Sequence, residues 1–242
     1  GQARTYVVCP DDAPANIDVA RACESFRSMR AYVSMGLLTQ MTVEKKYTVG
    51  DLATGLGDTF EVNVKVLGPS WVRADRVELF ANGQRIRQRE ITTGAAIVKS
   101  NVSWRLAKPT YDLHLVAIAT GPGIDAPFWD IPRSYQPKWK RHVPRVQGAT
   151  NPIWIDADSD GQHTSPREYA RREIRRAKGD LAKVIAALKP YDQAVAAQAA
   201  SLLHETGHDP RSGLLGQALK QTTPAVRAGF DAYAATLPSS KK

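Results

Sequence analysis

Cysteine is scarce in this chain, and long apolar runs are missing from it. Its 242 residues include only Cys9 and Cys23, too few for the disulfide framework of a small secreted scaffold. They could pair with each other or pack as small apolar groups. No apolar stretch approaches the roughly 20 residues that a membrane-spanning helix needs, and the first residues lack the basic start and apolar run of a signal peptide. We therefore expect no membrane partner, while the compartment stays open.

The chain does contain enough apolar residues for a core, and an excess of positive charge. With 43% hydrophobic and 24% charged residues it can form one or two globular domains. The net charge of +9 raises the question of nucleic-acid binding. In the most basic segment, REYARREIRRAK, Glu168 and Glu173 stand four and three residues before Arg172 and Arg176, a spacing typical of ion pairs within one helix. We interpret this segment as a solvated, self-paired helix face.

Hydrophobic periodicity predicts an α+β fold. Residues 16–29 have apolar positions at helical spacing, which predicts a short amphipathic helix with one buried side. From about residue 31 to 120 the period changes to two, as in the alternation along 60–66, and Asn82-Gly83 is a strong hairpin signal because both turn positions need positive φ. These strands indicate an antiparallel β-sandwich of immunoglobulin or fibronectin type.

The C-terminal part is predicted to be helical from Ser165 onwards. Pro166 suits a first-turn position, and Pro190 and Gly207 divide the rest into about three segments. The expected domains are therefore an N-terminal helix and connector (1–38), a sandwich (39–164) and a helical region (165–242).

Residues 121–150 are predicted to form a long irregular loop within the sandwich. The segment holds five prolines and four aromatic residues, Phe128, Trp129, Tyr135 and Trp139. A loop of this length is usually functional or packed by its own side chains. Packing over a sheet edge and binding of a domain or a carbohydrate ligand are both open.

The most specific motif is the run D-x-D-x-D-G at Asp156, Asp158, Asp160 and Gly161. Three carboxylates on a tight turn repel one another unless a hard cation lies among them, which is typical of a calcium loop. In an EF-hand-type register the further ligands are the carbonyl of Gln162 and Thr164. The twelfth position holds Arg167 in place of glutamate, with Glu168 next to it. We predict a structural calcium ion on residues 156–164 and Glu168; the alternative is a solvated acidic turn before the helix.

The segment HETGH, from His204 to His208, matches the zinc motif H-E-x-x-H. Gly207 and the following Pro210 indicate, however, that a helix stops there, so the second histidine would leave the helix face. We expect a helix end and no catalysis at this motif.

Four segments together resemble the C-terminal part of PHP-type metallohydrolases of the CehA/McbA family. They are RTYV (4–7), FRSMRAYVSMGLL (26–38), GPSWVRADRVELFANGQ (68–84) and ATNPIWIDADSDG (149–161). The resemblance covers roughly residues 3–168 and implies a sandwich that follows a metal-binding barrel. The metal-binding motif that precedes the RTYV segment in that family has no counterpart here, so the resemblance implies a missing upstream barrel as partner and carries over no catalytic residue.

These observations favour a non-catalytic accessory region of a PHP-like metallohydrolase. The competing functions are an independent module that binds carbohydrate or an acidic partner, and a zinc hydrolase at HETGH.

Overall fold

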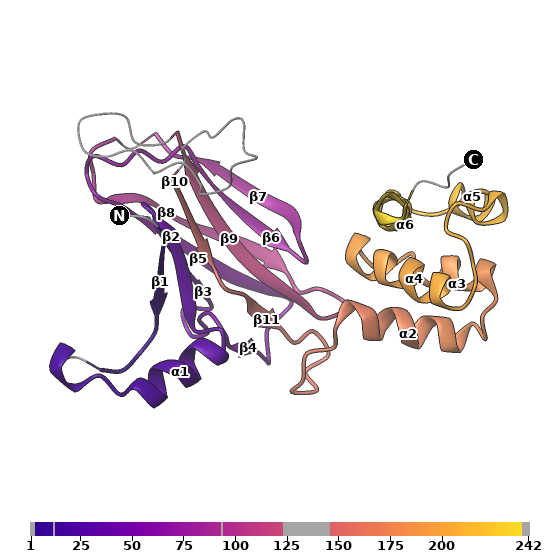
Figure 1. The fold of residues 1–242 in the computed structure, drawn as a ribbon, viewed down its shortest axis with the longest axis horizontal. Helices are drawn as coiled ribbons and strands as arrows, with labels where there is room; N and C mark the ends of the chain where they lie inside the picture. The colour runs from indigo at the N-terminus through magenta and orange to yellow at the C-terminus, as the bar shows by residue number, and fades with distance from the viewer. Residues whose placement is uncertain (1–2, 12, 93, 123–145, 239–242) are drawn as a thin grey trace. The chain divides into compact units, whose positions relative to one another are not determined.

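The computed structural model describes residues 3–11, 13–92, 94–122 and 146–238. In this part the chain is an α+β protein with two antiparallel-rich sheets and six α-helices (Figure 1). It divides into two compact units, the sheet unit (Gly1–Lys108 and His114–Gly161) and the helical unit (Pro109–Leu113 and Gln162–Lys242). Within the described ranges, no helix has the length and apolarity to cross a membrane.

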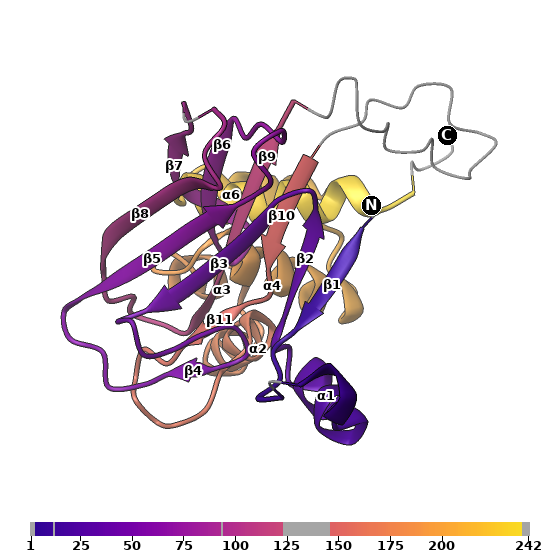
Figure 2. The ribbon, with the colours of Figure 1, turned by 90° about the vertical axis from the view of Figure 1, so that its left-hand side faces the viewer.

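The sheet unit contains a larger and a smaller sheet, which Figure 2 shows from the side of β3 and β5. In the smaller sheet, β5 is the central strand, and the order is β3 (Leu38–Val43), β5 (Thr59–Leu67) and β8 (Val98–Ala107). The larger sheet has β1 at one edge, and β6 and β7 extend it from β9. Its order is β1 (Arg4–Val7), β2 (Ala31–Met35), β10 (Val146–Thr150), β9 (Leu113–Gly121), β11 (Ile153–Ile155) and β4 (Leu52–Ala53), with β6 (Arg76–Ala81) on β9 and β7 (Gln84–Glu90) on β6.

The core of the sheet unit is formed by alternate residues of both sheets. Val62, Val64 and Val66 of β5 are wholly buried, as are Ala117 and Ala119 of β9. Each buried valine removes apolar surface from water and stabilises the fold by about 1.5–3 kcal/mol. The period of two predicted for these strands is therefore confirmed, and the arrangement is compatible with a β-sandwich.

The predicted hairpin at Asn82-Gly83 is confirmed. Asn82 has φ 47° and Gly83 has φ 81°, and the two residues connect β6 to its antiparallel partner β7. Positive φ at both central positions gives a turn whose twist matches the twist of the flanking strands.

The segment expected to be irregular up to residue 150 ends in a strand. β10 pairs with β2 on one side and with β9 on the other, which the short polar sequence VQGAT did not signal. The missing side chain of Gly148 lets β10 lie close to the start of β3, since a Cβ there would lie 2.5 Å from Leu37 O and 2.7 Å from Thr39 Oγ1. Phe128, Trp129, Tyr135 and Trp139 lie outside the described residues.

The predicted N-terminal helix is α1 (Val19–Arg27), preceded by a 3-10 turn, η1 (Pro14–Asn16). The side chain of Asp18 caps α1 by accepting the N–H of Arg21 at 3.0 Å. No residue of α1 is buried. The helix thus differs from the expectation that one of its sides would be buried within the chain.

The described residues of the helical unit form five helices, whereas about three were expected. The breaks at Pro190 and Gly207 are as predicted. Two others were not predicted, one at Gly179, which has φ 76°, and one before Pro224. At each break a polar side chain caps the next helix. The helices are α2 (Pro166–Arg176), α3 (Leu181–Ala187), α4 (Gln193–Glu205), α5 (Gly213–Leu219) and α6 (Pro224–Thr236).

Candidate functional site

Exposed apolar side chains are concentrated in the N-terminal elements, by which we mean β1, α1, β2 and the segments that join them. Seven of the eleven large hydrophobic residues that are exposed in the described structure lie here: Tyr6, Val8, Ile17, Val19, Phe26, Met29 and Val33. Phe26 is 58% exposed and Val19 is 68% exposed, although both belong to an amphipathic helix. β1 is an edge strand, and three of its four residues are exposed. A surface of this composition is typical of a protein–protein contact.

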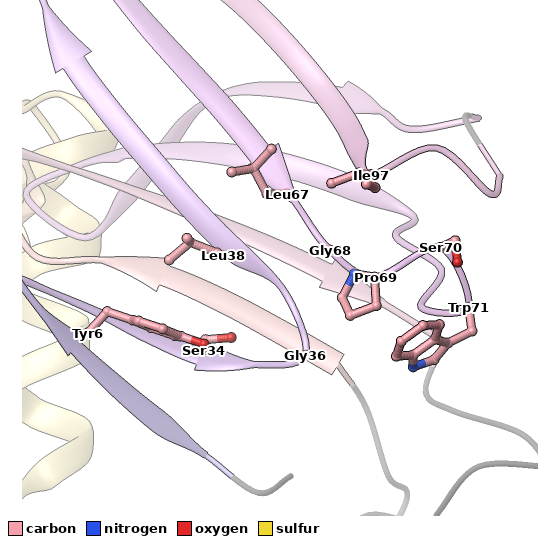
Figure 3. A pocket seen from close by; sticks show the side chains of 10 residues that line it. All are labelled: Tyr6, Ser34, Gly36, Leu38, Leu67, Gly68, Pro69, Ser70, Trp71 and Ile97. Carbon is pink, nitrogen blue, oxygen red and sulfur yellow. The ribbon is translucent and has the colours of Figure 1, made fainter. Parts of the chain in front are cut away.

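A groove lies at one end of the smaller sheet. It has a volume of about 450 Å³, and its apolar lining comes from four separate parts of the chain. Figure 3 shows the side chains that line it. Trp71 is 46% exposed and follows a short loop that leaves β5. The apolar lining residues are Tyr6, Leu38, Leu67, Pro69, Trp71 and Ile97. The groove therefore presents an aromatic and aliphatic surface to a ligand.

Lys99 is buried next to this groove. Its Cε lies 3.4 Å from the position that a Cβ of Gly68 would occupy, and Gly68 lines the groove. Its Nζ donates a hydrogen bond to Gly94 O at 2.9 Å. Burial disfavours the charged ammonium and lowers the pKa of Lys99. The aliphatic part of Lys99 thus packs against Gly68 at the groove, and its amine holds Gly94 in the loop before β8 by a hydrogen bond.

A second, polar hollow of about 250 Å³ lies on the smaller sheet. It is lined by Gln40, Met41, Thr42, Asn63, Lys65 and Asn101. Asn63 is held in place because its Nδ2 donates to Glu61 Oε1 at 2.6 Å and its Oδ1 accepts from the Ser103 hydroxyl. This hollow offers hydrogen-bonding groups where the groove offers apolar ones.

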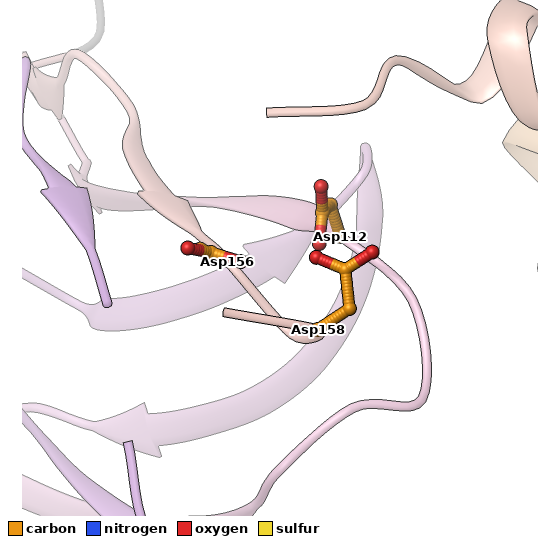
Figure 4. Close-up of side chains that lie close together, drawn as sticks. All are labelled: Asp112, Asp156 and Asp158. Atoms are coloured by element: carbon orange, nitrogen blue, oxygen red, sulfur yellow. The ribbon is translucent and has the colours of Figure 1, made fainter. Parts of the chain in front are cut away.

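The acidic turn begins directly after β11, and Figure 4 shows the side chains of Asp156 and Asp158. Asp156 is wholly buried, and its carboxylate accepts the N–H of Asp160 at 3.2 Å and that of Gly161 at 2.9 Å. Asp158 is exposed, and its Oδ1 accepts the same Asp160 N–H at 3.3 Å. Gly161 has φ 80°, as the sequence predicted for a turn glycine. Backbone hydrogen bonds to Asp156 thus stabilise the turn, and calcium binding there stays a prediction.

The other predicted calcium ligands belong to the helical unit. Thr164 is buried, and its N–H donates to Asp112 Oδ2 at 2.7 Å, while Gln162 is exposed. Glu168, in the first turn of α2, pairs with Arg171 and, at 3.8 Å, with Arg172. The predicted ligand set is therefore divided between the two units. Asp112, also drawn in Figure 4, anchors the start of the helical unit because its own N–H donates to Tyr169 Oη at 3.0 Å.

The HETGH segment lies at a helix end, as predicted. His204 is in the last turn of α4, where its Nδ1 is 2.9 Å from Tyr233 Oη. Gly207 has φ 93°, and the chain leaves the helix there, so that His208 Nδ1 lies 3.3 Å from Leu203 O. Glu205 pairs with Arg167 at 2.8 Å. Each of the three motif side chains thus has a partner that supports the end of the helix.

The basic segment of α2 forms the ion pairs that its spacing predicted. Arg176 Nη1 lies 2.7 Å from Glu173 Oε1, in addition to the pairs of Glu168. The pairs of Glu168 lie at the helix surface and contribute only a few tenths of a kcal/mol each, whereas Glu173 is buried.

Sequence reasoning missed the groove because its residues are far apart in the chain. Trp71 is one residue of the segment 68–84, whereas the aromatic residues for which the sequence predicted packing or binding lie in 121–150. A tryptophan next to Gly68-Pro69 in a turn was the available signal, since turn residues are usually at the surface.

No family model, no curated protein and no solved structure matches the chain.

Proposed function

We propose that this chain is a non-catalytic interaction region that docks on a partner domain through its N-terminal elements. The observation that carries the proposal is that α1 is amphipathic and capped, yet none of its residues is buried. A helix of nine residues is marginal in water without packing of its apolar face. We therefore expect the apolar face of α1 to pack against a surface outside the described part of the chain.

Edge strand β1 extends the same argument. Its residues are exposed on both faces of the strand, and exposed edges are sites where another chain can add contacts. Val33 of the neighbouring β2 is 45% exposed, although Tyr32 and Ser34 on either side of it are buried. An apolar side chain that points to water between buried neighbours fits a contact that forms on docking.

The partner that fits the resemblance described above is the catalytic barrel of a PHP-type metallohydrolase, connected upstream of β1. In this proposal the larger sheet is part of an immunoglobulin-like accessory sandwich, and the barrel supplies the catalytic metals. The pairing of His204 with Tyr233 and of Glu205 with Arg167 supports a structural role for the HETGH segment in this chain.

The test compares the 242-residue chain with a longer polypeptide that also includes the residues encoded upstream of it. We expect the amide hydrogens of residues 19–27 to exchange rapidly in the 242-residue chain, and to become strongly protected in the longer one. Phe26→Asp and Val19→Asp should weaken this protection. They should change the free energy of unfolding of the 242-residue chain by less than about 1 kcal/mol, because both side chains are exposed.

Leu214→Asp is the matched control, since Leu214 is equally exposed but lies in α5. Strong protection of α1 in the short chain, or equal protection of the longer chain in the Phe26→Asp variant and the wild type, would refute the docking role.

A further inference from the structure

The outer face of the smaller sheet carries side chains in ordered rows. The register places Leu38 beside Leu67, Gln40 beside Lys65, and Thr42 beside Asn63. On the other side of β5, Lys65 is opposite Asn101 and Asn63 is opposite Ser103. Side chains two residues apart on a strand point to the same face. The apolar row at one end is therefore followed by two polar rows on the same surface.

These rows connect the groove to the polar hollow. Leu38 and Leu67 line the groove, while Gln40, Asn63, Lys65 and Asn101 line the hollow. From Leu67 to Asn63 the strand advances four residues, about 13 Å. The face thus joins an apolar end, with Trp71 and Tyr6, to an end rich in amides and hydroxyls.

The polar groups are suited to a ligand with many hydroxyls. Among the described residues, the carboxamides of Gln40 and Asn101 have no hydrogen-bond partner, so each can both donate and accept. Asn63 is oriented in advance by Glu61 and Ser103. A side chain that is already fixed loses little entropy when it binds a ligand.

We propose that this face binds an uncharged oligosaccharide. A sugar ring has an apolar C–H face that packs on an aromatic or aliphatic surface, and hydroxyls at its edge that need donors and acceptors. The groove around Trp71 provides the apolar surface, and Gln40 and Asn101 provide the hydrogen-bond donors and acceptors. The length of the face suits a short chain of sugar units and not a single ring.

Charge and backbone hydrogen bonding favour this ligand over others. Lys65 and Arg105 on the face are accompanied by Glu61, which lies opposite Arg105, so the face lacks the dense positive charge that a nucleic acid or an acidic glycan needs. β5 is paired on both sides, so its backbone groups are unavailable to an added peptide strand. Recognition on this face therefore proceeds through side chains.

The binding proposed here is independent of docking through α1, because it rests on β3, β5, β8 and Trp71. Tyr6 is the residue common to both surfaces, and the experiments below do not depend on it. A failure of either proposal therefore leaves the other standing.

The test uses the 242-residue chain and an array of uncharged and acidic oligosaccharides, followed by titration calorimetry with the best uncharged binder. We expect millimolar or tighter binding, accompanied by a change in tryptophan fluorescence. Trp71→Ala should weaken binding at least about tenfold, the equivalent of about 1.4 kcal/mol. Gln40→Ala and Asn101→Ala should each weaken it severalfold with an unchanged melting temperature, since neither side chain has a partner in the described structure.

Matched controls lie elsewhere on the protein. Gln88→Ala removes an exposed glutamine from β7, and Leu214→Ala removes an exposed apolar side chain from α5; neither should change the affinity. Three results would overturn the proposal. The first is no binding of any uncharged oligosaccharide at millimolar concentration. The second is binding only of acidic glycans or extended peptides. The third is full affinity in a Gln40→Ala, Asn101→Ala double variant.

Discussion

The hydroxyl of Tyr191 donates a hydrogen bond to the carboxylate of Glu173, with 3.1 Å between Oη and Oε1. Glu173 is buried on α2, and the same oxygen accepts a bond from Arg176 at 2.7 Å. Tyr191 lies in the turn between α3 and α4, so this bond links two segments of the helical unit. Burial, followed by the negative charge of Glu173, raises the pKa of Tyr191 to about 12.

This raised pKa predicts a loss of stability at high pH. The neutral phenol is favoured in the folded state, so its contribution is fully present below the unfolded pKa of about 10 and is lost as the pH rises towards the folded value. Tyr191→Phe should lower the free energy of unfolding at neutral pH by about 1 kcal/mol, and this deficit should shrink between pH 10 and 12. Denaturant unfolding across that range measures it, with Tyr233→Phe as the control. A deficit that stays constant with pH would contradict the prediction.

Two glycines of the helical unit should respond to alanine in opposite directions. A Cβ on Gly229 in α6 would lie 2.5 Å from Ala196 Cβ and 2.6 Å from Gln193 O on α4, so Gly229→Ala should destabilise the unit by about 1–3 kcal/mol. Gly216 in α5 has open space around that position, and Gly216→Ala should stabilise the helix by about 0.5–1 kcal/mol. Thermal unfolding of both variants tests the pair. Equal effects would show that α4 and α6 do not pack as described.

Calcium should stabilise the sheet unit if an ion binds at the acidic turn. We expect an excess of calcium to raise the melting temperature relative to EDTA, because a ligand that binds only the folded state adds to its stability. Asp158→Ala should abolish the rise without unfolding the protein, since Asp158 is exposed. Magnesium at the same concentration is the control ion. Superimposable unfolding curves in calcium and EDTA would leave the turn as a hydrogen-bonded structure without an ion.

Zinc should not be held by the HETGH segment. Zinc ligands lie about 2.0–2.1 Å from the metal, whereas His204 is paired with Tyr233 and His208 follows the turn at Gly207. Protein prepared free of metal and then dialysed against zinc should have the same zinc content in the wild type and in His204→Ala. One equivalent of zinc that disappears in His204→Ala would establish a metal site there.

Local features could be predicted because neighbouring residues decide them. The Asn82-Gly83 turn, the alternation along β5 and the ion pairs of α2 all depend on groups within a few residues of one another. The helix breaks at Gly179 and Pro224 have comparable local signals, a glycine with positive φ and a proline in the first turn of α6.

The strand β10 and the groove could not be predicted in this way. β10 is a strand because it pairs with both β2 and β9, which come from other parts of the chain. Gly148 has no side chain that would collide with Leu37 and Thr39. The groove brings together residues 6, 38, 67–71 and 97 from four separate parts of the chain. Register and strand order, which no single segment encodes, determine that these residues meet.

The sequence by itself determined the two kinds of structure, the hairpin, the helix end at HETGH and the glycine turn after β11, since each follows from backbone preferences and capping within one segment. Only the tertiary structure decided that α1 buries none of its residues, that apolar and polar rows share one face of the smaller sheet, and that Asp156 is buried on backbone N–H groups. Burial is a property of what packs around a residue, and those neighbours come from distant parts of the chain.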